Sequence, residues 1–337
     1  MIRFEPVEIA ADDWTRAVAP LDGFSLVQCW EYGAARTGDG AQAERGLFYR
    51  DGRVIGAAQV VTRALPLVGG GLAWVSRGPL LRRGDTTADD LTAMLQALHR
   101  HYVGSRGYYL RIASTLAADD PRTEAFPSAG FHLTDSPGWA SALLDLAPDE
   151  QTLRRGLRGN WRNHLNKAER AGLTVETGSD DAGFTACVEE YRAFLAERGF
   201  STGVTPELLL RLQALLPDER KMVFFRGRHD GVSLGSILIV RYCDRCECLV
   251  NTVGAAGRRH GLGQLLVWRA ICEMKARGMA AFDVGGMDPA LTPKGIYDFK
   301  TGIGGVAYRL ANEIEADDGG LRARLVRWRV ARARSGG

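Results

Sequence analysis

A glycine turn flanked by basic residues is the feature of this sequence that points most directly to chemistry. The turn, Arg258-Arg259-His260-Gly261-Leu262-Gly263, follows an apolar strand and opens a largely apolar helix. Glycines allow the backbone to approach a bulky group, and the free N–H groups at a helix start favour negative charge. We therefore expect Arg258 and the backbone of Gly261, Leu262 and Gly263 to bind a phosphate or pyrophosphate. The alternative is an ordinary tight connection, in which this glycine spacing is common.

Two well-known phosphate-binding motifs do not fit this turn. It lacks the Gly-Lys-Ser/Thr of a P-loop, and no acidic residue closes a following strand at the distance expected of a dinucleotide-binding unit. His260 is expected to be a turn residue, because the six scattered histidines offer no triad partner.

Ionisable residues follow the glycine turn. Asp283 lies within a predicted strand at 280–284, Asp288 lies just past it, and a predicted loop carries Tyr297 and Lys300. The two carboxylates are candidate proton acceptors and Tyr297 is a candidate proton donor, since such groups serve general acid–base catalysis. For each of them, capping or packing is the alternative interpretation.

The elements that must hold these residues follow an order that occurs twice: a hairpin, a strand, a long helix and another strand. In the first half we predict strands at 4–9, 46–49, 54–61, 72–75, 108–112, 131–133 and 141–146, and helices at 10–18, 28–36, 89–103 and 122–129. In the second half we predict strands at 173–176, 222–226, 232–242, 248–253, 280–284 and 308–314, and helices at 184–198, 206–216 and 262–277. This order fits an α/β fold with mixed sheets covered by helices.

The repeat predicts two domains, residues 1–150 and 151–337. In the first copy, Leu80–Thr87 precedes the long helix without an equivalent glycine turn. We therefore expect the second domain to hold the activated donor, and the first domain and the junction to hold the acceptor.

Charge is divided unevenly between the two halves. Residues 1–150 carry 14 Arg and 19 acidic residues, a net charge of −5, whereas residues 151–337 carry 29 basic and 21 acidic residues, a net charge of +8. This asymmetry favours an anionic partner for the second half, such as a cofactor, RNA or lipid headgroups. A solvated surface is the alternative.

The junction, Glu150–Gly172, predicts an amphipathic helix with Leu153, Leu157, Trp161 and Leu165 on one face and arginines beside it. Gly156 and Gly159 weaken helical structure by about 1 kcal/mol each relative to alanine, so its start is expected to be broken. The arginine stripe suits a polyphosphate or nucleic-acid backbone, with a solvated face as the alternative.

Other segments exclude some classes of protein. The cysteines of Cys243-Asp-Arg-Cys246-Glu-Cys248 are expected to be structural thiols in a hairpin, because a closed zinc site needs four ligands. The sequence contains no apolar run of about 18 residues, so no membrane span is expected. Acidic residues near the N-terminus stand where a signal peptide would be apolar, so a cytoplasmic location is expected. The arginine-rich helix expected at 321–334 could contact RNA or an anionic membrane peripherally, or remain solvated.

Several motifs together resemble known families. The Arg258-x-x-Gly261-x-Gly263 turn resembles the acyl-CoA pyrophosphate loop of GNAT acetyltransferases. More of the chain, at roughly residues 20–315, resembles the Fem family, whose members join two GNAT-like domains and transfer amino acids from aminoacyl-tRNA, typically onto peptidoglycan precursors. The related BioF2-like acetyltransferases share these motifs. The matching segments are Phe24-Ser25-Leu26-Val27-Gln28-x-Trp30, Asn160-Trp161-Arg162-x-x-Leu165-x-Lys167-Ala168, Leu265-Leu266-x-Trp268, Phe282-Asp283-x-Gly285-Gly286 and Gly295-Ile296-Tyr297-x-Phe299-Lys300-x-Gly302.

The resemblance implies a tandem GNAT-like fold and a role for particular residues. Lys300 would meet the phosphate or sugar at the donor's end, with Phe299 packed beside it. Arg162, with Trp161 in the same motif, and Arg36 would grip the acceptor's diphosphate. No metal and no tightly bound cofactor are implied.

The leading hypothesis is an acyltransferase that forms an amide bond by moving an aminoacyl group from aminoacyl-tRNA to an amine acceptor. Aminolysis needs an unprotonated amine and a stabilised carbonyl oxygen, and no protein nucleophile. An acyl-CoA-dependent N-acyltransferase is the first alternative, favoured by the intact glycine turn. A non-catalytic module that binds a nucleotide-sugar or an anionic lipid is the second. No DNA partner is expected.

Overall fold

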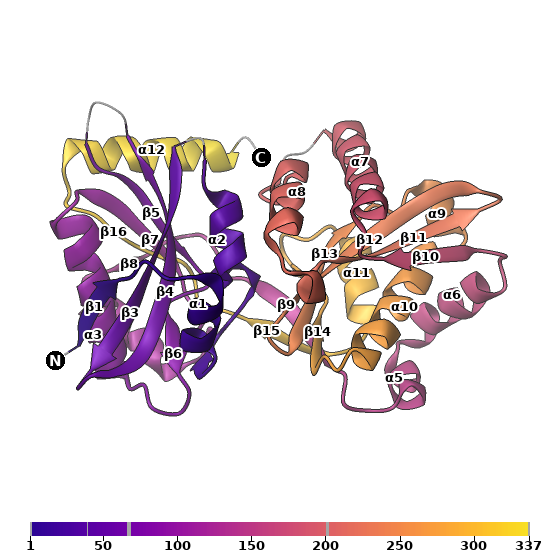
Figure 1. Ribbon diagram of the computed structural model, residues 1–337, viewed down its shortest axis with the longest axis horizontal. Helices are drawn as coiled ribbons and strands as arrows, with labels where there is room; N and C mark the ends of the chain where they lie inside the picture. Colours follow the sequence, from indigo (N-terminus) through magenta and orange to yellow (C-terminus); the bar gives the residue numbers. More distant parts are fainter. Residues whose placement is uncertain (1, 39, 66–68, 200–201, 336–337) are drawn as a thin grey trace. The chain divides into compact units, whose positions relative to one another are not determined.

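The computed structural model describes residues 2–38, 40–65, 69–199 and 202–335. The chain forms two compact units, Met1–Trp139 with Arg309–Gly337, and Ala140–Tyr308. Each unit contains one mixed sheet with helices packed on it, as Figure 1 shows. The predicted α/β class with mixed sheets is confirmed.

The first unit is built on a sheet with the strand order β1-β3-β4-β5-β7-β16-β8, with β2 and β6 joined to it beside β4. Its strands are β1 (Arg3–Pro6), β2 (Leu21–Asp22), β3 (Ala41–Arg50), β4 (Arg53–Ala64), β5 (Gly71–Ser76), β6 (Leu80–Arg82), β7 (Tyr108–Ala113), β8 (His132–Leu133) and β16 (Ile314–Ala316). Its helical segments are α1 (Ala11–Val18), η1 (Leu26–Gln28), α2 (Trp30–Arg36), α3 (Ala88–Leu98), η2 (His99–Gly104), η3 (Pro121–Glu124), α4 (Ala125–Ser128) and α12 (Leu321–Ser335).

The second unit is built on a sheet with the order β10-β11-β12-β13-β14-β9-β15. Its strands are β9 (Ala140–Asp145), β10 (Thr174–Gly178), β11 (Val223–His229), β12 (Val232–Tyr242), β13 (Arg245–Asn251), β14 (Ala281–Asp283) and β15 (Val306–Arg309). Its helical segments are α5 (Glu150–Gly156), α6 (Gly159–Glu169), α7 (Asp181–Arg198), α8 (Pro206–Leu215), η4 (Asp218–Arg220), α9 (Ala255–Arg259), α10 (Leu262–Ala276) and α11 (Lys294–Gly302).

The two sheets repeat one topology. In each, an antiparallel hairpin leads to a strand that pairs in parallel with the strand after the next long helix: β5 with β7 around α3, and β13 with β14 around α10. Both hairpins turn through an Asp-Gly pair with positive φ, Asp51-Gly52 and Asp230-Gly231. Such a turn matches the twist of paired strands. The predicted internal duplication is confirmed.

In each sheet, the sixth strand comes from a part of the chain far from the strand that it pairs with. Strand β9, which follows the first unit in the chain, pairs with β14 of the second unit, whereas β16 returns to pair with β7 of the first. The structural boundary therefore differs from the predicted 150/151 boundary, and residues 309–337 belong to the first unit. A local pattern of alternating residues reports that a segment is a strand, but not which sheet it joins.

Two predictions about the C-terminal third are wrong. The strand expected at 308–314 is two strands, β15 and β16, in different sheets. The predicted loop that carries Lys300 is the helix α11, which follows Pro293 and has a Lys294–Asp298 ion pair one turn apart. Its two glycines hid the helical pattern, and packing of Tyr297 and Phe299 against the core of the second unit stabilises the helix.

The hairpin expected around the cysteines is confirmed. Strands β12 and β13 meet at Cys243-Asp244, Cys246 is fully buried, and burial raises its pKa above the usual thiol range. In the described part of the chain, no helix has both the length and the apolar character needed to cross a membrane.

Candidate active site

The parallel pair β13–β14 separates at the carboxyl ends of its strands, and this point holds the most chemically distinctive residue. The pairing begins at Arg245 with Ala281 and stops at Glu247 with Asp283. A glycine, Gly285, with φ of +76°, lies at the separation, and a β-carbon there would be 2.9 Å from the Cys248 carbonyl oxygen. In α/β sheets, ligands bind outside the carboxyl ends of parallel strands.

Lys300 reaches into this separation from α11. Its Nζ donates to the Gly286 carbonyl oxygen at 2.8 Å and lies 3.4 Å from where a β-carbon of Gly285 would be. Burial lowers the pKa of the Lys300 ammonium, and the charges of Cys248, Asp283 and Glu247 oppose that shift. Lys300 is therefore a half-buried cation that lies near acidic groups and bonds to a backbone carbonyl, a position from which an ammonium can also contact an anionic ligand.

Asp283 is held by three donors rather than free to accept a proton. Its carboxylate accepts hydrogen bonds from the hydroxyls of Ser141 and Tyr308, the latter at 2.6 Å, and from the Gly285 N–H at 2.9 Å. The Asp283 side chain is buried. This arrangement fixes the end of β14 and therefore fits a positioning role. Ser141 and Tyr308 were not predicted, because they lie 142 and 25 residues away in the chain.

Asp288 and Tyr297 differ in their surroundings. The Asp288 carboxylate accepts from the N–H groups of Ala290 and Leu291, and the Asp288 N–H donates to the Thr292 hydroxyl. These bonds make Asp288 a cap for the segment before α11. Tyr297 is half-buried on α11 and packs against the core of the second unit. Its carbonyl oxygen accepts a hydrogen bond from the Thr301 hydroxyl, one helical turn later.

The glycine turn is covered by protein. Gly261 has φ of +72°, and a β-carbon on it would lie 2.6 Å from the His164 carbonyl oxygen of α6. Lys167 of the same helix donates to the Arg259 carbonyl oxygen at 3.1 Å. Gly261, Leu262 and Gly263 are all buried. The glycines therefore permit the close approach of α6 to the start of α10.

Arg258 and Phe299 complete this packing on two sides of the turn. Arg258 is exposed, yet its Nη1 donates to the Val253 carbonyl oxygen at 2.9 Å, which ties α9 to the segment that follows β13. Phe299 of α11 would lie 3.3 Å from a β-carbon on Gly263. Helices α6, α10 and α11 thus meet at the glycines, and this contact places Lys300.

Trp161 is a packing residue of the same assembly. Its ring lies 5.9 Å from the Phe299 ring, and a β-carbon on Gly302 would lie 2.5 Å from its Cδ1. Its indole N–H is buried and has no hydrogen-bond partner among the described residues. A buried donor without a partner is uncommon in proteins, and this one lies beside α11.

The arginines of the junction fall into two groups. As predicted, the helix is broken, with α5 ending at Gly156 and α6 starting at Gly159. Arg154 is neutralised by Glu169, at 2.6 Å, and stacks on Trp268. Arg162 donates to the Arg155 carbonyl oxygen at 3.2 Å, and Arg158 donates to the Thr301 hydroxyl at 3.4 Å. Among the described residues neither Arg158 nor Arg162 has a carboxylate partner.

Arg36 belongs to a different unit from these residues. Arg36 is exposed at the end of α2 in the first unit, whereas Arg162, Lys300, Phe299 and Asp283 all belong to the second. In the first unit the long helix α3 is capped by its own residues, because Thr87 and Asp90 form a capping box. By contrast, α10 has no side-chain cap.

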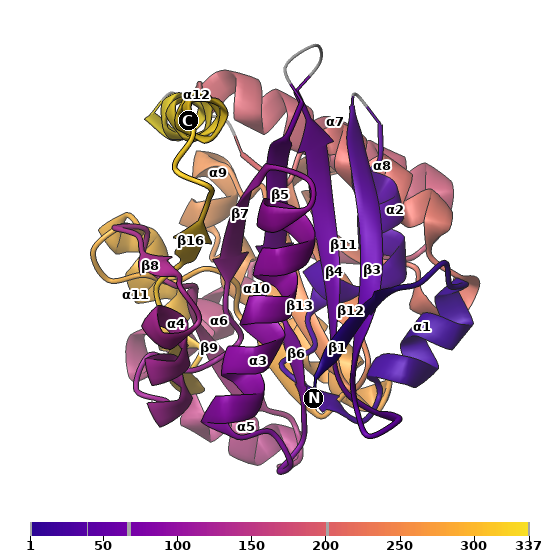
Figure 2. The ribbon, with the colours of Figure 1, turned by 90° about the vertical axis from the view of Figure 1, so that its left-hand side faces the viewer.

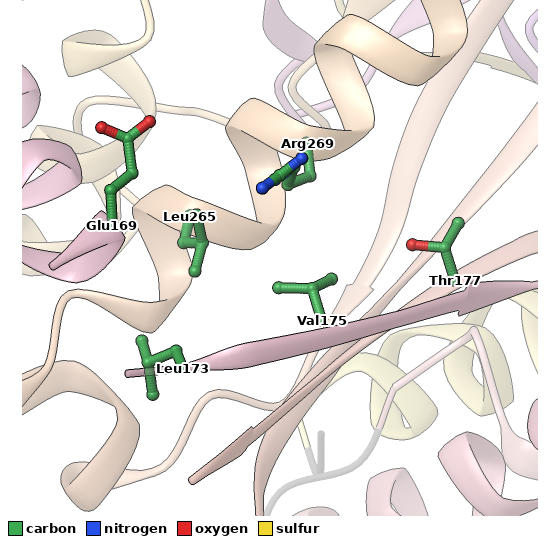
Figure 3. A pocket seen from close by; sticks show the side chains of 6 residues that line it. All are labelled: Glu169, Leu173, Val175, Thr177, Leu265 and Arg269. Carbon is green, nitrogen blue, oxygen red and sulfur yellow. The ribbon is translucent and has the colours of Figure 1, made fainter. Parts of the chain in front are cut away.

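A shallow groove of about 210 Å³ lies elsewhere in the second unit, between α6, β10 and α10 (Figure 3). Its lining residues are Glu169, Leu173, Val175, Thr177, Leu265 and Arg269. No predicted site residue lines this groove, and its carboxylate Glu169 is already paired with Arg154.

Comparison with known proteins agrees with this architecture. Residues 155–301 match the family model described as "Acetyltransferase (GNAT) domain". The matched segment begins in α5 and ends in α11, so it includes the glycine turn and Lys300. No curated protein sequence matches the chain.

Solved structures extend the likeness to the whole chain. The crystal structure of FemX is similar with a TM-score of 0.81 at 15% identity, over 96% of this chain and 99% of that one. A tandem GNAT protein from the clavulanic acid biosynthesis pathway is similar with a TM-score of 0.54 at 15% identity, over 95% and 99% of the two chains. L-PGS from Bacillus licheniformis gives a TM-score of 0.54 at 15% identity, over 95% and 97%. This chain therefore has a tandem GNAT-like fold, and its residues 155–301 match a GNAT acetyltransferase domain.

Proposed function

We propose that this protein is an acyltransferase that moves an aminoacyl group from aminoacyl-tRNA to an amine acceptor, forming an amide bond. The observation that carries the proposal is the position of Lys300, whose half-buried ammonium lies where β13 and β14 separate. A phosphodiester next to Lys300 would compensate its ammonium in a low-dielectric setting, where such a pair is stronger than in water.

The chemical step needs little from the protein beyond placement. The neutral amine attacks the ester carbonyl carbon, so a C–N bond forms and the C–O bond to the terminal ribose breaks. The proton released from the amine ends on the ribose hydroxyl that leaves. Holding donor and acceptor in contact supplies most of the acceleration in such reactions. Lys300 would orient the donor's phosphate or sugar, and Phe299 would support Lys300 on α11.

The covered glycine turn favours this donor over acyl-CoA. A pyrophosphate bound at the turn would need access to the N–H groups near Leu262 and Gly263; both residues are buried, and Phe299 of α11 lies 3.3 Å from the position of a β-carbon on Gly263. The closeness of Gly261 to the His164 carbonyl oxygen gives this glycine a packing function that needs no ligand. Phosphate recognition is then assigned to Lys300.

The acceptor is proposed to be an amine that also carries negative charge. Arg158 is the N-cap of α6 and Arg162 lies near the start of this helix, and neither has a carboxylate partner among the described residues. Guanidinium groups bind phosphates through paired hydrogen bonds, so a diphosphate-bearing acceptor fits this surface. A cell-wall precursor with such a group is one acceptor of this class, in line with the resemblance to the Fem family.

An acyl-CoA-dependent N-acyltransferase is the second candidate. The match to the GNAT acetyltransferase domain and the Arg258-x-x-Gly261-x-Gly263 spacing favour it. It would place the CoA pyrophosphate at the start of α10, beside the Lys167 contact with the Arg259 carbonyl oxygen.

A transfer assay with two donors tests the proposal. The purified chain would be given radiolabelled aminoacyl-tRNA or acetyl-CoA, each with a panel of amines that includes nucleotide-linked and lipid-linked acceptors. The proposal predicts an amide product from charged tRNA alone. Products from acetyl-CoA with none from charged tRNA would reject it in favour of the second candidate.

A further inference from the structure

The C-terminal helix α12 has two apolar faces on opposite sides. Ala323 and Val326 are 2% and 5% exposed and pack toward the sheet of the first unit. Leu321, Leu325 and Trp328 are 81%, 37% and 52% exposed. With about 3.6 residues per turn, these three lie within one stripe on the side opposite Ala323 and Val326.

The rotation of α12 about its axis is set by contacts with the first unit. The helix packs beside β5 and β7 (Figure 1 and Figure 2). Arg327 pairs with Asp317 and, at 3.4 Å, with Glu315, and its guanidinium lies 5.6 Å from the Tyr109 ring centroid. Arg327 therefore fixes the rotation of α12. Turning the exposed leucines and tryptophan toward the sheet would break these ion pairs.

Arg322, Arg324, Arg329 and Arg332 border the exposed stripe. Arg322, Arg324 and Arg329 are exposed, and within the described residues none of the three makes a side-chain hydrogen bond or ion pair. Arg332 stacks on Trp328, with 4.7 Å between its guanidinium carbon and the ring centroid. No acidic residue occurs between Leu321 and Ser335, and the nearest exposed carboxylate, Asp318, precedes the helix and accepts from the Gly320 N–H.

We propose that the exposed face of α12 binds the surface of an anionic membrane. Leu321, Leu325 and Trp328 would enter the boundary between headgroups and acyl chains, while the bordering arginines contact lipid phosphates. Helices that bind in the plane of a membrane combine an apolar face, Trp or Leu side chains and basic residues in this way. The indole ring prefers this boundary because one edge is polar.

The exposed apolar stripe favours a membrane over RNA. RNA phosphates would contact the arginines, but binding to RNA would leave the two exposed leucines without a role. A membrane surface uses both sets of side chains at once. The inference concerns the first unit and does not depend on the identity of the acyl donor.

Vesicle co-sedimentation of the full chain tests the proposal. The probes are neutral phosphatidylcholine vesicles and vesicles of one part phosphatidylglycerol to about two parts phosphatidylcholine. We expect binding to the anionic vesicles only, weakened by added salt because surface electrostatics are screened. Absence of binding to anionic vesicles would overturn the proposal, and if the chain then bound tRNA through the same arginines, α12 would be an RNA contact instead.

Two sets of variants and matched controls identify the surface. Leu321→Ser/Leu325→Ser/Trp328→Ser and Arg322→Gln/Arg324→Gln/Arg329→Gln should each reduce vesicle binding about tenfold or more. Leu133→Ser, at an exposed leucine of β8, and Arg16→Gln/Arg53→Gln/Arg100→Gln, which removes the same charge elsewhere, should bind as the wild type does. Wild-type binding by the apolar variant would contradict insertion of the stripe.

A fluorescence measurement places the helix at the membrane. Brominated lipids quench tryptophans that enter the acyl region, so wild-type fluorescence should fall on binding and the Trp328→Phe variant should lose that quenching. Equal quenching of the two proteins would overturn the orientation proposed for α12. A change of oligomeric state in the apolar variant without vesicles, with no loss of vesicle binding, would assign the stripe to a second copy of the chain.

Discussion

A β-carbon on Gly261 would lie 2.6 Å from the carbonyl oxygen of His164, so the glycine turn and helix α6 fit together only because residue 261 has no side chain. Two motifs that lie about 100 residues apart therefore form one packed assembly. Together with α11 they place Lys300 at the carboxyl ends of β13 and β14.

Replacing Gly261 with alanine should destabilise the second unit. A left-handed backbone costs an L-residue about 1–2 kcal/mol, and the contact with His164 adds to that cost. Gly278→Ala is the matched control, because Gly278 also has a positive φ, +78°, but no atom lies within 4 Å of its would-be β-carbon. Denaturant unfolding should give the larger loss for Gly261→Ala. Equal losses would show that α6 does not constrain the turn.

Lys300→Met should make the free protein more stable at neutral pH while reducing acyl transfer. Burial depresses the folded-state pKa of Lys300 below its unfolded value of 10.5. Between these two pKa values the unfolded chain binds more protons than the folded chain, so the wild type gains stability as pH rises through that window. The advantage of Lys300→Met should therefore shrink as pH rises toward 10.5. Urea unfolding at a series of pH values measures this, and an advantage that grows with pH would contradict the depressed pKa.

Asp283 should prove to be a positioning residue. Tyr308→Phe removes one donor to its buried carboxylate and should cost about 1–3 kcal/mol in the free energy of unfolding. If Asp283 only fixes the end of β14, the pH at which kcat/KM is half-maximal should stay the same in Tyr308→Phe, although its stability falls. A marked shift of that pH would instead indicate that Asp283 accepts a proton during catalysis.

Arg162→Gln should weaken the binding of an anionic acceptor. Loss of one phosphate contact should raise the acceptor KM about tenfold, equivalent to about 1.4 kcal/mol, with little change in kcat. Arg154→Gln is the control, because Arg154 is already neutralised by Glu169 and should affect stability rather than KM. Steady-state kinetics with a diphosphate-bearing acceptor distinguishes the two, and equal KM values for both variants would remove Arg162 from the acceptor site.

Local patterns in the sequence predicted most of the elements and the duplication. These patterns are local, since each depends on residues only a few positions apart. They are the alternation of apolar residues, the Asp-Gly turns at 51–52 and 230–231, and the helix break between Gly156 and Gly159. The order of strands within each sheet could not be predicted in the same way. The exchange of β9 and β16 depends on pairing across long stretches of chain, which alternation does not encode.

The sequence named Lys300 and Asp283 as candidate site residues, and the structure places both near the end of β14, but the packing around the glycine turn was not predicted. Lys300 and Asp283 lie in the predicted region, yet the glycines that suggested an open phosphate cradle are filled by α6 and α11. Sequence spacing cannot distinguish a glycine that admits a ligand from one that admits a neighbouring helix. The partners Ser141 and Tyr308 were missed because each is an ordinary polar residue within a strand, with no motif that links it to Asp283.

The central claim is that Lys300, rather than the glycine turn, receives the donor, and that this donor is aminoacyl-tRNA. The direct measurement is calorimetric titration of the wild type and of Lys300→Ala with CoA and with an acceptor-stem RNA that carries a non-hydrolysable 3′-aminoacyl amide. We predict that the RNA analogue binds the wild type and that Lys300→Ala weakens it about tenfold or more, a loss of at least 1.4 kcal/mol, while CoA does not bind. Tight binding of CoA with no binding of the RNA analogue would contradict the account.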